Sequence, residues 1–269
     1  VLTVEKPGIH DGNSKASCPK EYFEKNAISQ RLADYRQTID TVRTREDFRK
    51  GWNGSLMWIG GSEGGAVASL LAPLFPETTA LALLCSAGGM TMAEEMKTLR
   101  AKALKREKRT DLEIQRALTE LESQFSEIRA NPTSERTFWG DTNTFKWWAS
   151  ILDLDLKQGL DRLNSYVYLA QGTEDISVPI ESADVLVRGK ETGPFHKWTY
   201  VRYEGLDHAF ETASGISKKP MVLQNALSWL LVREDQRLRF AVADFYKDKT
   251  DKSLLPEMER ELQERDLLN

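Results

Sequence analysis

Short apolar runs alternate along the chain with amphipathic stretches, the pattern typical of a mostly parallel sheet flanked by helices. Four runs predict strands of such a sheet: residues 56–59, 80–86, 166–170 and 198–203. The first is short and continuously apolar, as expected of a strand buried on both faces. A fifth run, residues 1–4, is β-branched, is closed by the turn Pro7-Gly8, and also predicts a strand.

Helical periodicity appears between these runs. Apolar residues from Ile28 to Val42 recur at a spacing of three or four, which places them on one face of a helix. Residues 66–74 form an apolar helix that stops before Pro76, and residues 221–232 predict a further helix after the last strand. The sequence therefore predicts an α/β fold.

The alternation stops from residue 90 to residue 158. This stretch contains a charged segment, an amphipathic helix marked by Ile114, Leu121 and Ile128, and a run rich in aromatic residues. We interpret residues 90–158 as a helical cap over the sheet edge, residues 1–89 and 159–232 as the core, and residues 233–269 as a charged helical tail. The tail either covers the core or pairs with another subunit, and the oligomeric state stays open.

Composition narrows the classes of partner. The chain has 269 residues and a formal net charge of −4, which argues against a general nucleic-acid-binding protein. Its apolar runs are too short to span a bilayer. Two cysteines and three scattered histidines lack the spacing of metal ligands, so we expect no metal and no cofactor. The chain begins with Val rather than Met, and the localisation is left open.

The segment Gly60-Gly61-Ser62-Glu63-Gly64-Gly65 lies between a predicted strand and a predicted helix. A sharp turn at this point strains the serine backbone and lifts its hydroxyl clear of the sheet. We expect a Cβ two positions before or after Ser62 to meet neighbouring backbone, which would require glycine at 60 and 64. The backbone N–H of Glu63, at the helix start, is a candidate donor to an oxyanion beside Ser62.

This segment, together with Gly172-Thr173-Glu174-Asp175 and Gly205-Leu206-Asp207-His208, resembles the nucleophile, acid and histidine motifs of the α/β-hydrolase superfamily. The likeness is greatest to the esterase, dienelactone-hydrolase and acyl-peptidase branches, and it covers residues 1–232 without the insertion. The family usually has about three strands before the one that matches residues 1–4. Such strands are expected to be missing here, together with the loop that commonly supplies a second oxyanion donor.

The family order of serine, acid and histidine selects the partners of Ser62. His10 precedes Ser62, and His196 lies at the amino end of a predicted strand. His208 follows the carboxyl end of that strand, and Asp175 follows the strand 166–170. The resemblance therefore implies a triad in which His208 is the base of Ser62 and Asp175 orients the imidazole.

Such a triad implies a serine hydrolase that cleaves an ester, thioester or amide of a small-molecule or peptide acyl substrate through an acyl-enzyme. One alternative is acyl transfer from the same triad. A second is a catalytically silent binding protein on the hydrolase fold.

Two features of the insertion have alternative interpretations. The tryptophans Trp139, Trp147 and Trp148 either bind substrate in an acyl pocket or anchor the cap to the sheet. A run of seven cations between Lys97 and Arg109 is interleaved with glutamates, so a solvated helix face is favoured over a site for an anionic ligand.

Overall fold

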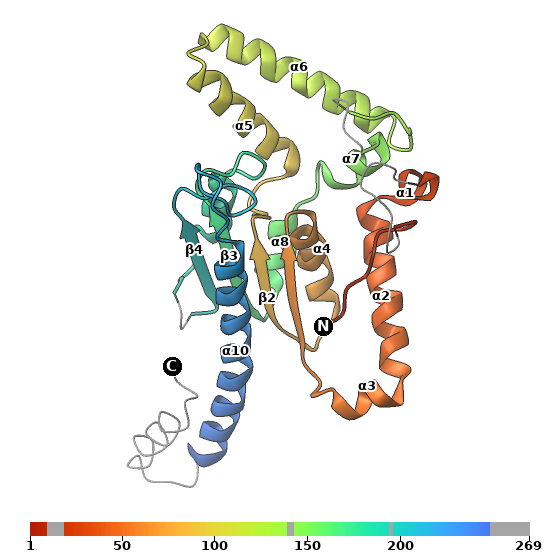
Figure 1. The fold of residues 1–269 in the computed structure, drawn as a ribbon, viewed down its shortest axis with the longest axis vertical. Coiled ribbons are helices and arrows are strands. Elements are labelled where there is room, and N and C mark those ends of the chain that lie inside the picture. The colour runs from red at the N-terminus through yellow and green to blue at the C-terminus, as the bar shows by residue number, and fades with distance from the viewer. Residues whose placement is uncertain (10–18, 139–142, 194–195, 248–269) are drawn as a thin grey trace. The chain divides into compact units, whose positions relative to one another are not determined.

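Four parallel strands form one sheet in the computed structural model, which describes residues 1–9, 19–138, 143–193 and 196–247, with side chains up to residue 233 (Figure 1). The strands are β1 (Leu56–Gly61), β2 (Thr78–Leu84), β3 (Tyr166–Gly172) and β4 (Trp198–Tyr203). Their spatial order is β1-β2-β3-β4, with every neighbouring pair parallel. The four apolar runs are thus confirmed as strands, with ends shifted by one or two residues.

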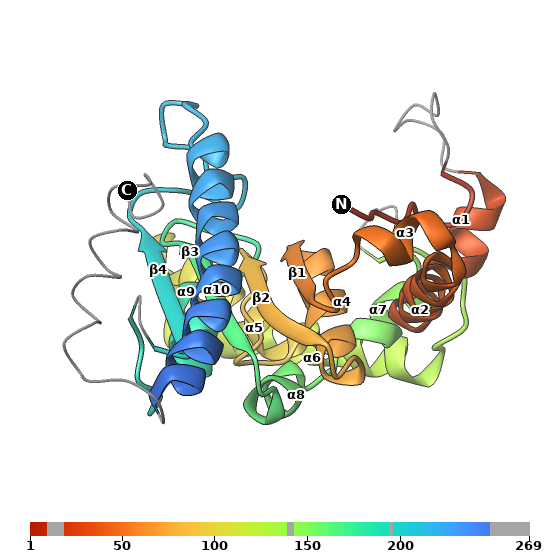
Figure 2. The same cartoon turned by 90° about the horizontal axis from the view of Figure 1, so that it is seen from below.

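Helices lead into and connect these strands. Before the sheet come α1 (Lys20–Lys25), α2 (Ile28–Thr44) and α3 (Glu46–Gly51); α4 (Glu63–Leu71) and the short 3-10 helix η1 (Ala72–Leu74) join β1 to β2. After the insertion, α8 (Leu156–Arg162) leads into β3, α9 (Ile180–Val187) joins β3 to β4, and α10 (Lys219–Lys247) follows β4. Figure 2 shows the strands side by side, with α4 next to β1 and α2 beyond it.

The insertion is helical, as predicted. It consists of α5 (Met92–Arg106), α6 (Asp111–Ala130) and α7 (Phe145–Ile151). Both long helices begin with a capping box, Thr91 with Glu94 and Thr110 with Glu113, which satisfies free backbone N–H groups at the helix start. Phe125 of α6 and Trp148 of α7 belong to the same apolar core as the sheet residues Leu81 and Leu169. The cap therefore packs on the sheet through one continuous core.

Two predictions about the first part of the chain are wrong. Residues 1–4 form no strand: the carbonyl oxygens of Val4 and Glu5 accept bonds of 2.6 and 2.7 Å from the Arg31 guanidinium. In addition, β1 is not buried on both faces, since Met57 and Ile59 are 38% and 42% exposed. In the described part of the chain β1 is an edge strand, because no strand pairs with its outer edge.

The chain divides into two compact units, Val1–Ala226 and Leu227–Asn269. The first contains the whole sheet together with the insertion, and the division falls within α10. Among the described residues, no helix has the length and apolar character needed to cross a membrane.

Candidate active site

Ser62 occupies the sharp turn between β1 and α4. Its backbone has φ 51° and ψ −125°, a conformation that residues other than glycine rarely adopt. Two bonds hold the turn: the Ser62 N–H donates to the Leu84 carbonyl at 3.0 Å, and the Ser62 carbonyl accepts from the Gly65 N–H at 2.9 Å. The Ser62 side chain is exposed, as predicted for a hydroxyl raised above the sheet.

The glycines around Ser62 do not all have the predicted role. A Cβ on Gly60 would lie 2.3 Å from the Gly64 carbonyl oxygen, so glycine is required there. A Cβ on Gly64 would meet nothing within 4 Å, and the predicted need for glycine at 64 is wrong. The close approach is one residue later, because a Cβ on Gly65 would lie 2.1 Å from the Ser86 hydroxyl oxygen.

Asp175 and His208 come from the loops that follow β3 and β4. These loops lie against each other, since the Glu174 N–H donates to the Leu206 carbonyl at 3.0 Å. Gly172 makes this approach possible: a Cβ on it would lie 2.3 Å from the same Leu206 oxygen. Sequence reasoning did not identify this third close approach.

Ser62, His208 and Asp175 form one chain of hydrogen bonds. His208 Nε2 lies 3.0 Å from Ser62 Oγ, and His208 Nδ1 lies 2.9 Å from Asp175 Oδ2. With the ring proton on Nδ1, the imidazole donates to the carboxylate and leaves Nε2 to accept the serine proton. The structure thus brings together the three residues that the sequence singled out.

The Asp175 carboxylate is fully buried and saturated with donors. Its Oδ1 accepts from the backbone N–H groups of Ser177 (2.7 Å) and Val178 (2.8 Å), and its Oδ2 accepts from Gln171 Nε2 at 2.8 Å. Burial acts to raise the pKa of Asp175, but the bonds from His208 and from the backbone outweigh it, and the pKa lies below its ordinary value. Asp175 therefore stays ionised beside His208.

His208 is partly exposed and responds to that charge. The hydrogen bond to Asp175 raises the pKa of His208 above 6.5, against the opposing effect of burial, and the charges of Asp175 and Asp207 add to the rise. A carboxylate that stabilises the imidazolium in this way favours proton uptake by the ring.

Glu63, directly after Ser62, has a role that the sequence did not reveal. Its N–H is at the first position of α4, where the helix provides no acceptor. Its carboxylate oxygen Oε2 accepts from Lys6 Nζ at 2.7 Å and from the Trp147 indole N–H at 3.0 Å. The Glu63 side chain thus connects the turn at Ser62 to the N-terminal segment and to helix α7 of the cap.

The three tryptophans predicted to bind substrate have different outcomes. Trp147 is buried and bonded to Glu63, and it does not line the cavity under the cap. Trp148 packs edge-on against Trp147 and does line that cavity. Trp139 lies outside the described residues.

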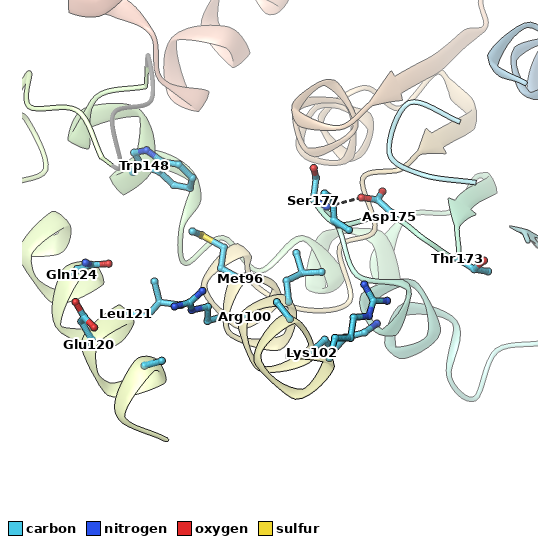
Figure 3. Close-up of a pocket in the computed structure, with 15 residues that line it drawn as sticks. Met96, Arg100, Lys102, Glu120, Leu121, Gln124, Trp148, Thr173, Asp175 and Ser177 are labelled. Carbon is cyan, nitrogen blue, oxygen red and sulfur yellow. Dashed lines mark hydrogen bonds between the residues drawn. The ribbon is translucent and has the colours of Figure 1, made fainter. Parts of the chain in front are cut away.

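Two cavities adjoin Ser62 and Asp175. A cavity of about 280 Å³ has Ser62, Glu63, Lys6 and Trp58 in its wall. A larger one of about 780 Å³ lies between α5, α6 and residues 173–177, the loop that carries Asp175 (Figure 3). Its size is in the range of cavities that hold small organic ligands.

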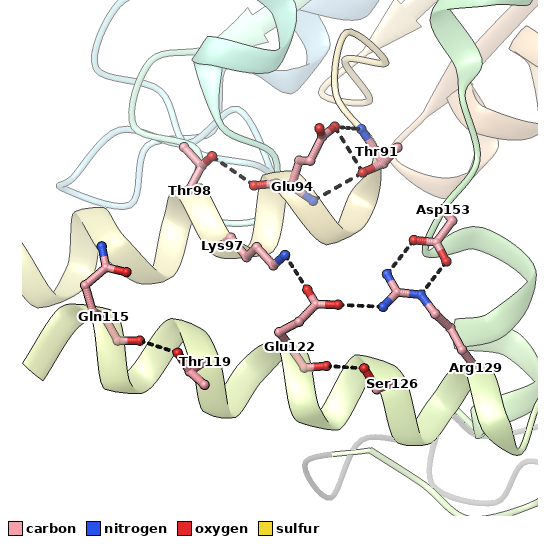
Figure 4. A network of polar contacts seen from close by, with 10 residues as sticks. All are labelled: Thr91, Glu94, Lys97, Thr98, Gln115, Thr119, Glu122, Ser126, Arg129 and Asp153. Carbon is pink, nitrogen blue, oxygen red and sulfur yellow. Dashed lines mark hydrogen bonds and ion pairs between the residues drawn. The ribbon is translucent and has the colours of Figure 1, made fainter.

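A polar network holds the helices around the larger cavity (Figure 4). Lys97 of α5 pairs with Glu122 of α6, and Glu122 also accepts from Arg129 at 2.8 Å. The Arg129 guanidinium then donates two bonds of 2.7 Å to Asp153, in the turn before α8. This bidentate pair fixes the end of α6 to the segment that returns to the sheet.

Within the described residues, Cys85, Asp175 and His208 are a group of three potential metal ligands, with ligand atoms within 4.8 Å of one another. The carboxylate and imidazole are already bonded to each other. Burial is the main cause that raises the pKa of the Cys85 thiol far above its ordinary value, so the thiol stays protonated. We therefore interpret Cys85 as a core residue that also packs against the triad.

No protein-family model matches the sequence, and no curated protein matches it. Among solved structures, Est1E from Butyrivibrio proteoclasticus with ferulic acid bound is 15% identical, with 80% of this chain and 72% of that chain covered and a TM-score of 0.54. A second structure of Est1E is 14% identical, with 78% of this chain and 72% of that chain covered and a TM-score of 0.51. MGS-MChE2, an α/β-hydrolase enzyme from the metagenome of lagoon sediments, is 16% identical, with 80% and 74% covered and a TM-score of 0.46.

The two Est1E structures, whose TM-scores exceed 0.5, bear on the fold alone, because their identities to this chain are low. The chain has the α/β-hydrolase fold.

Proposed function

We propose that this protein is a serine hydrolase that cleaves an ester, thioester or amide through an acyl-enzyme, with Ser62 as nucleophile, His208 as base and Asp175 as the group that orients His208. The observation that carries the proposal is the unbroken chain of bonds from Ser62 Oγ through the His208 ring to a buried carboxylate, at 3.0 and 2.9 Å. A serine hydroxyl needs an adjacent base to become a nucleophile at neutral pH.

In the first half of the reaction, Ser62 Oγ attacks the substrate carbonyl carbon while its proton moves to His208 Nε2. The negative charge on the carbonyl oxygen is stabilised by the free Glu63 N–H and the N-terminal end of α4. His208 then gives its proton to the leaving group, and the acyl group stays on Ser62. In the second half, His208 takes a proton from water, the resulting hydroxide attacks the acyl carbon, and Ser62 recovers its proton.

The ester class has additional support from the comparison. Est1E, a structure of which contains bound ferulic acid, shares the fold over four fifths of this chain. We therefore place carboxylic esters first among the substrates to be tested.

A fluorophosphonate probe tests the proposal directly. We expect one adduct by intact mass, mapped to Ser62, and no adduct in Ser62→Ala. Ser214→Ala is the matched control, because Ser214 is exposed and, among the described residues, its side chain bonds only to Thr212. Labelling at Ser86 or Ser214, or none at all in the folded protein, would refute the assignment and favour a silent binding protein.

Kinetics provide a second test. Ser62→Ala and His208→Ala should each lower kcat by up to about 10⁶-fold, and Asp175→Ala somewhat less. The triple variant should be scarcely worse than the worst single variant, because the three residues act as a unit. Additive losses, or full activity in Asp175→Ala, would contradict the proposed roles.

A further inference from the structure

The cavity under the cap has walls of mixed character. Its apolar lining comes from α5, α6, α7 and the loop beside Asp175, and includes Met96, Leu99, Leu121, Trp148 and Ile176. Ile176 is adjacent to Asp175 and is 72% exposed, so its side chain is accessible to a ligand in the cavity. The apolar walls suit the hydrocarbon or aromatic body of a substrate.

Three cations of the basic run also line this cavity: Arg100, Lys102 and Arg106, all from α5 (Figure 3). The sequence favoured a solvated helix face for that run, and Arg100 and Arg106 are exposed. The winding of α5 also brings all three side chains to the cavity wall. Two of them have partners outside the wall, since Lys102 Nζ lies 2.8 Å from Glu181 and Arg106 lies 3.7 Å from Glu174.

Arg100 differs from the other two. Within the described part of the chain it takes part in no ion pair, although it lies on the wall between apolar residues. The carboxylates in the wall are Glu120 on α6 and Asp175, and Asp175 is already bonded to His208. Arg100 is exposed, so its guanidinium is accessible to a ligand, and its planar donors match the two oxygens of a carboxylate.

We propose that the substrate is an amphipathic acid: an acyl compound with an apolar body and a carboxylate at the end away from the scissile bond, and that this carboxylate pairs with Arg100. The apolar body lies along Met96, Leu121 and Trp148, and the cavity continues to the Asp175 loop of the triad. This inference rests on the proposed hydrolase function for its catalytic part, but not for the binding of the anion.

The kinetic test compares mono-p-nitrophenyl esters of straight-chain dicarboxylic acids with the same esters in which the far carboxylate is methylated. We expect kcat/KM to be about 10- to 100-fold higher for the acid than for the methylated analogue at the best chain length, as for a charge-assisted hydrogen bond. Arg100→Gln should remove this preference without lowering turnover of the methylated ester. Rising salt should weaken the preference.

Two further variants make the test specific. Glu120→Gln removes the opposing carboxylate from the wall and should raise kcat/KM several-fold for the acid alone. Lys105→Gln is the control, because Lys105 is exposed on the same helix but does not line the cavity. Equal losses in Arg100→Gln and Lys105→Gln would show a general effect of charge and would overturn the proposal.

Binding separates this inference from the proposed catalysis. Calorimetry with Ser62→Ala should detect binding of a saturated long-chain dicarboxylate monoester. In the double variant with Arg100→Gln, the affinity for this monoester should fall by about 10-fold or more. If the monoester binds in this Arg100-dependent way but the wild type is not labelled by the phosphonate, the proposed hydrolase function is refuted and the anion site at Arg100 is supported. Labelling and turnover with equal rates for acid and methylated esters would keep the hydrolase and overturn the anion site.

Discussion

Alanine at two glycines on either side of Ser62 should have opposite effects, although the sequence motif treats them alike. In Gly60→Ala the new methyl group would lie 2.3 Å from the Gly64 oxygen, 2.5 Å from the Gly64 carbonyl carbon and 2.7 Å from Gly65 Cα. Ordinary contact begins near 3.4 Å, so the backbone of β1 or of α4 must move by roughly 1 Å. Because Ser62 lies between them, its hydroxyl moves away from His208. A misplacement of this size costs on the order of 100-fold in kcat.

Gly64→Ala meets nothing within 4 Å and lies inside α4. Alanine is favoured over glycine within a helix by about 0.5–1 kcal/mol, which raises Tm by roughly 1–4 °C in a domain of this size. The matched pair is measured by thermal unfolding and by the rate of fluorophosphonate labelling at Ser62. Gly60→Ala should lose both stability and labelling, whereas Gly64→Ala should keep labelling and gain stability. Comparable losses in both variants would show that the backbone around Ser62 does not have the described geometry.

Four other predictions follow from the site. Because the pKa of His208 is raised, kcat/KM should rise with pH as the imidazole loses its proton, with a midpoint above 6.5. Asp175→Asn should move this midpoint to lower pH. An unchanged pH profile in that variant would contradict the pairing of His208 with Asp175. The same pair should stabilise the fold most between the ordinary pKa values of 3.8 and 6.5: the contribution of Asp175 is lost as pH falls through its lowered pKa, and that of His208 as pH rises through its raised pKa. Trp147→Phe removes the N–H donor to Glu63, and a hydrogen bond to a charged group is worth about 1.5–3 kcal/mol, so this variant should lower kcat for all esters alike. Trp148 lines the cavity, so Trp148→Phe should instead change how KM depends on the chain length of the ester. The sequence has one cysteine besides Cys85, namely Cys18, and Cys18→Ser removes it. Because Cys85 is buried and burial raises its pKa, a thiol reagent should react with this variant at the rate of unfolding. Rapid reaction of the folded protein would show that Cys85 is accessible.

The sequence by itself determined the four strands of the sheet, the helical insertion and the three candidate residues Ser62, Asp175 and His208. Strands and helices are encoded in the period of apolar residues, and the turn at Ser62 is encoded in six consecutive positions, so both signals are local. The order of the motifs then selected Asp175 and His208, because parallel strands bring their carboxyl ends to one edge of the sheet.

The tertiary structure decided which side chains and backbone groups surround each residue of the three motifs, because those neighbours come from distant parts of the chain. Gly64 has open space while Gly65 and Gly172 are enclosed, because their surroundings come from Ser86 and Leu206 on other strands and loops. Trp147 and Trp148 are adjacent in sequence, yet successive helical positions point about 100° apart, so one contacts Glu63 and the other the cavity.

The same distinction accounts for the predictions that were wrong. Residues 1–4 have the composition of a strand, but a strand needs a neighbour to satisfy its backbone, and Arg31 takes the place of that neighbour at Val4 and Glu5. The apolar run of β1 predicted burial on both faces, but burial depends on what packs on each face, and on one face of β1 Met57 and Ile59 stay exposed. Local periodicity determines what each segment becomes, while packing between distant segments decides what each side chain touches.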